Sequence, residues 1–277
     1  MDCLDSFILG LVQGLAEYLP ISSSGHLEIC QDLLGLDLSG KDALQFDLIL
    51  HVATVLSTIV ILWREFSGLC TSFFTFKRDA NTTIVWKILV SSIPVAIVGL
   101  CFKDVVESFF GSNLTVVGIC LIVTAALLAF AYFSRTLISS RGLHEVRSAS
   151  DGRPISYLDA FIIGCAQAIA VLPGLSRSGS TIATGIILGN KRDQVAKFSF
   201  LMVIIPILGE ALLTVIKLIK GEAGSESIGF LPAIIGFVTA FIVGCIACQW
   251  MINLVKRGRL VWFSIYCVIV GIICLIF

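Results

Sequence analysis

Two polar segments interrupt this apolar chain, and together they hold the residue types needed to bind and cleave a phosphate group. The segments are QGLAEYLPISSSGH at 13–26 and QAIAVLPGLSRSGS at 167–180. The first supplies a carboxylate, a hydroxyl and an imidazole at Glu17, Ser23 and His26, and the second supplies a fixed positive charge at Arg177. Arginine grips phosphate oxygens bidentately, a hydroxyl can attack phosphorus, and a nearby base can take its proton. The two segments therefore predict phosphoryl transfer, with these four residues as the catalytic set.

Other residues of the segments suit supporting roles. Gln13 and Glu17 are four residues apart, so they share one helix face, and their oxygens suit Mg²⁺ or Ca²⁺. The glycine, serine and threonine residues of the two segments are expected to bind substrate. They allow the backbone conformations in which amide groups point at an anion. This predicted substrate-binding set is Ser22, Ser24, Gly25, Ser176, Ser178, Gly179 and Thr181.

Several of these residues have a second interpretation that the sequence leaves open. Ser23 also suits a helix cap, His26 a structural histidine, and Gln13 a structural amide, since it recurs as Gln167. An ionisable residue inside a membrane is costly, which favours a functional role for Glu17 and Arg177. Three further polar residues within apolar runs are candidates that the sequence does not rank: Asp47, His51 and Glu210.

Composition places these segments in a membrane protein. Of the 277 residues, 57% are hydrophobic and 14% are charged, whereas a soluble domain has roughly 25% charged residues. The net charge is zero, with no basic face for a nucleic acid. The ten cysteines lack a framework spacing and are expected to be apolar fillers.

Six apolar runs are long enough to cross a bilayer by the criterion of about 20 residues. They lie near 44–63, 85–103, 114–133, 196–219, 229–252 and 260–277. Two further segments, 5–36 and 159–190, are broken by Pro20 and Pro173. Because exposed backbone is not tolerated in lipid, we expect each of these to be a re-entrant helix–loop–helix.

This arrangement of spans separates the positive charges between two sides. One side has 14 lysines and arginines and the other has 4, with Arg177 inside a re-entrant segment. The positive-inside rule makes the first side cytoplasmic and puts both termini outside. The richer side holds Arg64, Lys77, Arg78, Lys87, Arg135, Arg141, Arg147, Arg153, Lys191, Arg192, Lys197, Lys256, Arg257 and Arg259, and the other holds Lys41, Lys103, Lys217 and Lys220.

The two broken segments are copies of each other. Shifted by 154 positions, the chain matches itself at 12 of the 32 positions from 4 to 35, against about three expected from composition. Three spans lie between the copies, so the second should enter from the opposite face, and the two breaks should meet near the midplane. The fold prediction is an all-α polytopic membrane protein of one domain, 1–277, with an inverted repeat. Its parts are repeat one at 1–133, a cytoplasmic linker at 134–154 and repeat two at 155–277.

Both motifs and the FDLILH stretch at 46–51 resemble the bacterial undecaprenyl-diphosphate phosphatase family, also called the bacitracin-resistance protein family. The resemblance covers essentially the whole chain. It implies hydrolysis of undecaprenyl diphosphate to the monophosphate, recycling of the cell-wall lipid carrier and resistance to bacitracin. It also implies a nucleophile at Ser23, a histidine at His26, a phosphate-binding Arg177, and an (E/Q)xxxE motif at Gln13 and Glu17 that uses Mg²⁺ or Ca²⁺. Attack by water activated by Glu17 or His26 stays open.

Two other function classes fit parts of the pattern. Inverted repeats around a midplane site are typical of transporters, so a flippase of a lipid-linked phosphate is the main alternative. A lipid-binding receptor or scaffold is a weaker one. The expected partners are a prenyl diphosphate lipid, the bacterial inner membrane and, as one open oligomeric state, a second copy in a homodimer; no nucleic acid is expected.

Overall fold

The computed structural model describes residues 1–36, 40–75, 79–102, 105–106, 114–140, 152–219 and 229–276. Regular structure in these ranges is helical, apart from an isolated bridge between Arg153 and Asn190. Most of the predicted linker, residues 141–151, and six charges of the predicted map (Lys77, Arg78, Lys103, Arg141, Arg147 and Lys220) lie outside the described residues. The helices are α1 Cys3–Ala16, α2 Ser23–Leu33, α3 Gly40–Ile61, α4 Trp63–Phe74, α5 Ala80–Cys101, α7 Leu114–Ser140, α8 Tyr157–Ile169, α9 Arg177–Ile187, α10 Arg192–Met202, α11 Ile204–Ile219, α12 Phe230–Lys256 and α13 Val261–Ile276.

Several helices have the length and composition of membrane spans. Among the described residues, four pass this test: Ala80–Cys101, Leu114–Ser134, Arg192–Ile216 and Phe230–Lys256. A fifth is counted if α3 and α4, which bend by 88° at Leu62, form one broken span. Large apolar side chains such as Phe130, Ile246 and Trp262 are exposed on these and neighbouring helices, as lipid contact requires. The prediction of an all-α, multi-pass membrane protein is confirmed at this level.

Each broken segment folds as two short helices joined by a turn. α1 and α2 flank residues 17–22, and α8 and α9 flank residues 170–176, so both breaks fall at the predicted prolines. Both segments also begin with a capping box, formed by Asp2 with Asp5 in the first and by Ser156 with Asp159 in the second. The two segments thus share local structure as well as sequence.

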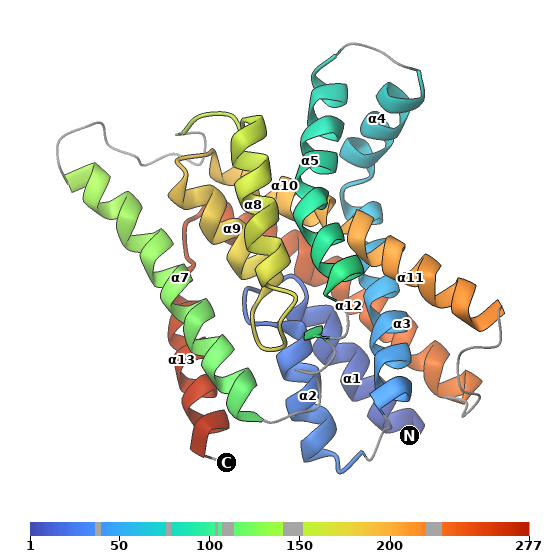
Figure 1. Ribbon diagram of the computed structural model, residues 1–277. Coiled ribbons are helices and arrows are strands. Elements are labelled where there is room, and N and C mark those ends of the chain that lie inside the picture. The colour runs from blue at the N-terminus through green and yellow to red at the C-terminus, as the bar shows by residue number, and fades with distance from the viewer. Residues whose placement is uncertain are drawn as a thin grey trace.

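Glycines bring helices from distant parts of the chain into close contact. α1 packs on α12, where a Cβ on Gly10 would lie 2.5 Å from the Gly236 carbonyl oxygen. α8 packs on α5, where a Cβ on Gly164 would collide with the Ser91 backbone. Figure 1 shows α1 starting near the lower edge of the molecule and α8 starting near the upper edge. The corresponding glycines of the two segments therefore pack against the other half of the chain.

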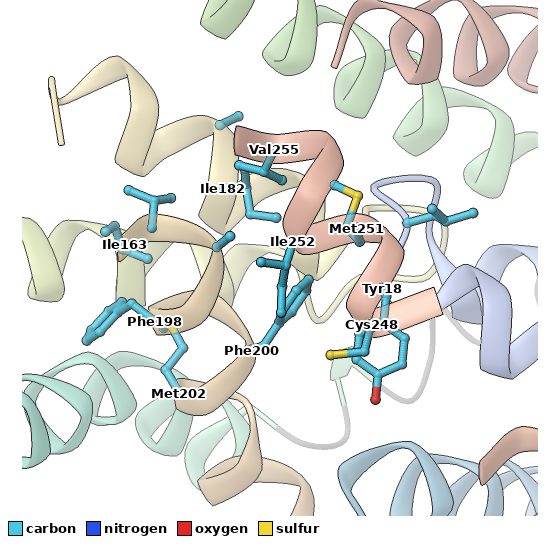
Figure 2. Packing of buried hydrophobic residues seen from close by; sticks show 14 of the residues in the cluster. Tyr18, Ile163, Ile182, Phe198, Phe200, Met202, Cys248, Met251, Ile252 and Val255 are labelled. Carbon is cyan, nitrogen blue, oxygen red and sulfur yellow. The ribbon is translucent and has the colours of Figure 1, made fainter. Parts of the chain in front are cut away.

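Tyr18 fixes the turn that follows α1. Its ring is buried and meets Phe200 of α10 edge-on, with the ring centroids 5.3 Å apart (Figure 2). Its hydroxyl donates to the Thr54 carbonyl oxygen of α3 at 2.5 Å. A buried tyrosine whose hydroxyl is satisfied holds the backbone more firmly than an apolar contact would, since displacing it leaves polar atoms unpaired. The turn that carries Glu17 is therefore anchored to α3 and α10 through the residue that follows it.

Candidate functional site

Glu17 is the centre of a polar cluster built from both broken segments. Its Oε1 accepts a hydrogen bond from Arg177 Nη2 at 3.1 Å. Its Oε2 accepts from Ser23 Oγ at 2.6 Å and from Gln13 Nε2 at 3.0 Å, and it lies 3.4 Å from His51 Nε2. The Glu17 side chain is only 9% exposed, so these partners replace water around a buried carboxylate.

The predicted meeting of the two segments is confirmed by contacts between their turns. Ser178 Oγ donates to the Leu19 carbonyl oxygen at 3.1 Å, which ties the start of α9 to the first turn. A Cβ on Gly25 would lie 2.9 Å from Gly174 Cα, so the start of α2 touches the second turn directly. Gly174 itself has φ +84°, a conformation that favours glycine.

Serines cap both of the helices that begin at this junction. The Gly25 N–H donates to Ser22 Oγ at 3.3 Å, and the Gly179 N–H donates to Ser176 Oγ at 3.0 Å. Ser176 has an ordinary negative φ, whereas the backbone of Ser22 has φ +71°. That conformation costs about 1–3 kcal/mol for a residue other than glycine, and such strain is common at functional sites. Each of these helices begins beside the other segment's turn, since a Cβ on Gly25 would approach Gly174 and one on Gly179 would approach Pro20. The dipoles of both N-termini favour an anion there.

The other predicted substrate-binding residues lie at the same junction. Ser24 Oγ is 3.3 Å from Ser22 Oγ, and Ser178 Oγ is 3.4 Å from Ser176 Oγ. Thr181 Oγ1 donates to the Arg177 carbonyl oxygen at 2.9 Å, so it braces the first turn of α9. The junction therefore brings together the whole predicted set, and several of its hydroxyls support the backbone.

His51, one of the three polar candidates that the sequence did not rank, lies beside the Glu17 carboxylate. Its Nδ1 lies 2.7 Å from the Asp47 carbonyl oxygen, one turn earlier on α3. A carbonyl only accepts, so Nδ1 carries a hydrogen and Nε2 faces Glu17. The sequence signal was the pair Asp47 and His51 at a spacing of four within an apolar run, which places both on one face of a helix. Of the other two unranked residues, Asp47 accepts from Gln31 at 3.3 Å and Glu210 lies on α11.

His26 points away from the Glu17 cluster. Its Nδ1 lies 2.8 Å from the Ser22 carbonyl oxygen, and its Nε2 lies 2.8 Å from the hydroxyl of Tyr266 on α13. The two rings are nearly parallel, at 16°, with centroids 5.6 Å apart. The structure thus brings Gln13, Glu17, Ser23 and Arg177 together and leaves His26 one helical turn away from Ser23.

A pocket opens on the side of Glu17 and Arg177 that faces α3, α10 and α11. Its lining combines polar and apolar side chains. Two buried polar atoms of its lining residues, Gln167 Nε2 and Ser199 Oγ, have no hydrogen-bond partner among the described residues. The lining residues are Glu17, Tyr18, Thr54, Val55, Thr58, Gln167, Arg177, Ser178, Thr181, Ser199, Phe200, Val203 and Ile207.

The donor set at Glu17 suits a divalent cation once an anion engages Arg177. Gln13 Oε1 is buried and has no hydrogen-bond partner in the part of the chain that the structure describes, which leaves a hard oxygen acceptor on the residue next to the carboxylate. Glu17 Oε1 is paired with Arg177, and a bound phosphate would compete for that guanidinium. Within the described residues no group of three or more His, Cys, Asp or Glu side chains is arranged to hold a metal. A cation here would therefore depend on oxygens of the bound anion to complete its shell.

Comparison with known proteins gives consistent matches along the whole chain. The family model described as bacitracin resistance protein BacA matches residues 6–273. A curated protein of Bacteroides fragilis named undecaprenyl-diphosphatase is 52% identical over 276 residues, covering 100% of this chain and 98% of that protein. Proteins with the same name are 52% identical in Parabacteroides distasonis, covering 99% of this chain and 97% of that one, and 36% identical in Oceanobacillus iheyensis, covering 98% and 95%.

Proposed function

The chain belongs to the bacitracin resistance protein BacA family, and on this premise we propose that it is an undecaprenyl-diphosphate phosphatase of the bacterial cytoplasmic membrane. It hydrolyses undecaprenyl diphosphate to undecaprenyl phosphate and inorganic phosphate, which returns the lipid carrier to cell-wall synthesis and gives resistance to bacitracin. Relatives named undecaprenyl-diphosphatase that match 98–100% of this chain support the proposal.

One observation carries the proposal: Arg177 and Ser23, from segments far apart in the chain, both bond to the Glu17 carboxylate. Arg177 supplies the clamp for a phosphate, and Ser23 supplies a hydroxyl that already donates its hydrogen toward a carboxylate oxygen at 2.6 Å. The capped starts of α2 and α9 add two positive dipole ends at the same junction. A transporter needs the clamp and the dipoles, but it has no need for a hydroxyl paired with a base.

The reaction follows from these contacts. The terminal phosphate binds Arg177 and the first turns of α2 and α9, which stabilises the charge that develops on its oxygens. Ser23 Oγ attacks the terminal phosphorus, its proton passes to Glu17 Oε2, and the bond from that phosphorus to the bridging oxygen breaks. Undecaprenyl phosphate leaves with the bridging oxygen. Water then attacks the phosphoserine. Because His26 points away from Glu17, the proton of this water reaches His26 through an intervening water molecule. The bond between phosphorus and Ser23 Oγ breaks as Glu17 returns its proton to Ser23, and His26 gives its proton to the departing phosphate.

Direct attack by water is a variant of the same mechanism. Glu17 or His26 then takes the proton of the water, and no phosphoserine forms. Ser23 would instead hold the terminal phosphate through its hydroxyl. Both variants need Arg177 and Glu17, and trapping of a phosphoserine distinguishes them.

A divalent cation, Mg²⁺ or Ca²⁺, belongs to this proposal. Glu17 and Gln13 would hold it, supported by the unpartnered Gln13 Oε1 and by the release of Glu17 Oε1 when the diphosphate takes Arg177. When bound, such an ion neutralises charge on the diphosphate oxygens. The glutamine variant of the (E/Q)xxxE motif leaves this chain one carboxylate fewer at that position.

The lining of the pocket beside the ion pair mixes charged and apolar side chains. It includes Glu17 and Arg177 as well as Val55, Val203 and Ile207. The space between them is only large enough for a water molecule or two, so the helices around it must move apart to admit a prenyl chain. We propose that the phosphate end of the substrate binds at Glu17 and Arg177 and that the isoprenoid tail extends toward the surrounding lipid.

We further propose the complete topology predicted from the sequence: six full spans and two re-entrant segments in one domain, related by an inverted repeat of 1–133 and 155–277 around a cytoplasmic linker. The opposite directions of α1 and α8 support the inversion, and so do their matching caps and glycine contacts. Figure 1 has both chain ends at its lower edge, which supports placing both termini on one side, proposed to be the outside. The homodimer stays a separate prediction, which light scattering on the detergent-solubilised protein would check.

Product analysis tests the proposed function. The purified protein, in detergent and without any gradient, should convert undecaprenyl diphosphate to undecaprenyl phosphate and inorganic phosphate. A folded protein that binds the diphosphate and leaves it intact would instead favour the flippase. Retention of full activity by Ser23→Ala and His26→Ala would remove both residues from the mechanism.

A further inference from the structure

The imidazole of His26 is held between two oxygen atoms, one at each ring nitrogen. Nδ1 lies 2.8 Å from the Ser22 carbonyl oxygen, and Nε2 lies 2.8 Å from the Tyr266 hydroxyl. The carbonyl oxygen can only accept, so Nδ1 carries a hydrogen. Nε2 is therefore the nitrogen at which His26 gains or loses a proton, and the Tyr266 hydroxyl is bonded to it.

A tyrosine hydroxyl is a suitable partner for a histidine that changes protonation state. It donates to Nε2 when that nitrogen is bare, and it accepts from Nε2 when that nitrogen carries a hydrogen. A carbonyl or a lysine ammonium at the same place would favour only one of the two states. Tyr266 can therefore keep the His26 ring in one orientation through a full cycle of proton uptake and release.

The position of Tyr266 is fixed by contacts on both sides of it along α13. Ser264 Oγ donates to the Ala125 carbonyl oxygen of α7 at 2.7 Å. Cys267 Sγ lies 3.6 Å from the Pro20 carbonyl oxygen, in the turn between α1 and α2. These contacts attach α13 to α7 and to the first turn on either side of Tyr266, whose ring lies at 16° to that of His26.

Close packing of α13 on α7 maintains this geometry. A Cβ on Gly271 would lie 2.9 Å from the Gly118 carbonyl oxygen, so the two helices approach backbone to backbone. Val117, the neighbour of Gly118, also touches Gly25 and Gly174 at the junction of the turns. The last helix is thus linked through α7 to the same junction that carries Ser23 and Arg177.

We propose that Tyr266 is a positioning residue for His26, holding the imidazole with Nε2 as its proton-exchanging atom; this inference rests on the phosphatase function proposed above. Tyr266 acts through His26 and does not contact the reacting phosphorus. The C-terminal helix, which has none of the motif residues, thereby contributes to the reaction. If Tyr266 only faced the membrane interface, loss of its hydroxyl would leave the reaction rate unchanged.

Steady-state kinetics of Tyr266→Phe test the proposal, because this change removes only the hydroxyl. We expect kcat to fall about tenfold, the value of one hydrogen bond, with KM unchanged. In a double-mutant cycle, Tyr266→Phe should have no further effect in a His26→Ala background, since its effect passes through that ring. Tyr157→Phe, which removes a hydroxyl from an exposed ring lying under Lys87, is the matched control and should retain wild-type kcat.

A spectroscopic measurement tests the contact without using activity. In ¹⁵N-histidine-labelled protein, the His26 signals, assigned with His26→Ala, should show hydrogen on Nδ1 in the neutral ring and should shift at Nε2 in Tyr266→Phe. An inactive wild-type protein would reject the phosphatase itself. If the wild type is active, three results would each reject this inference and leave the phosphatase standing. Tyr266→Phe could leave kcat and the Nε2 shift unchanged, or its effect on kcat could add to that of His26→Ala. The neutral His26 ring of the wild type could also carry its hydrogen on Nε2.

Discussion

Arg177 and Glu17 form an ion pair across 160 residues of sequence, with Nη2 of the arginine 3.1 Å from Oε1 of the glutamate. The carboxylate comes from the first broken segment and the guanidinium from the second. The pair holds the two turns together, and it places the charge that would bind a phosphate beside the hydroxyl of Ser23.

Replacing Arg177 by lysine should abolish most of the activity. A lysine keeps the positive charge but loses the fork that binds two phosphate oxygens at once, so kcat should fall by roughly a hundredfold or more. The measurement is phosphate release from undecaprenyl diphosphate. Arg257→Lys, at the end of α12, is the matched control and should behave as wild type. Near-normal turnover by Arg177→Lys would show that a point charge is enough.

Removing the Ser23 hydroxyl should lower the rate about a thousandfold if Ser23 is the nucleophile. Rapid quenching with a substrate radiolabelled in its terminal phosphate should then trap phosphate on wild-type protein and none on Ser23→Ala. Ser6→Ala is the control, because that buried hydroxyl donates only to the Asp2 carbonyl oxygen at the start of α1. Fast turnover by Ser23→Ala without trapped phosphate would favour attack by water.

Substitutions at His51 should depend on whether the new side chain can donate to Glu17. His51→Gln offers an amide N–H group to Glu17 Oε2 and should retain activity within about fivefold. His51→Leu offers none and should lose at least tenfold, since it leaves a buried carboxylate with fewer polar partners. Kinetics and thermal unfolding of the two variants check this. Equal activity in both variants would mean that the 3.4 Å contact with Glu17 is unimportant.

Changing Gln13 to glutamate should increase the affinity for the divalent cation. A second carboxylate one helical turn from Glu17 adds a charged ligand, so the Mg²⁺ concentration for half-maximal activity should fall about tenfold. The effect should also appear as tighter Mn²⁺ binding by electron paramagnetic resonance in the presence of a prenyl diphosphonate. An unchanged cation affinity in both assays would remove position 13 from the metal site.

A methyl group at Gly25 should separate the two turns. The added Cβ would lie 2.9 Å from Gly174 Cα and 3.0 Å from Val117 Cγ1, so Gly25→Ala should cost about 1–3 kcal/mol and much of the activity. Thermal unfolding in detergent measures the loss of stability. Gly99→Ala is the contrasting control, because its Cβ would meet no atom of the described residues within 4 Å. Replacing a glycine inside helix α5 by alanine should stabilise the protein by about 0.5–1 kcal/mol. Equal stability of the two variants would contradict the close approach of the turns.

The contact between Glu17, Ser23 and Arg177 could be predicted from sequence because the chain repeats itself. Aligned copies showed which residues diverged, and the breaks at Pro20 and Pro173 showed where the copies should meet. The partner of His26 could not be predicted, because Tyr266 reaches it only through the packing of α13 on α7. His51 was visible as a polar residue in an apolar run, but which way it faced depended on how α3 packs. Helix ends also departed from the apolar runs: α5 begins at Ala80, before its run, because Asp79 caps it.

The most direct test of a phosphatase built from both segments is phosphate release from undecaprenyl diphosphate by the purified protein, with and without EDTA, beside Arg177→Ala. We predict release by the wild type, loss of release with EDTA and its recovery with added Mg²⁺ or Ca²⁺, and loss in the folded Arg177→Ala variant. Absence of release by folded wild-type protein with either cation, or normal release by Arg177→Ala, would contradict the account.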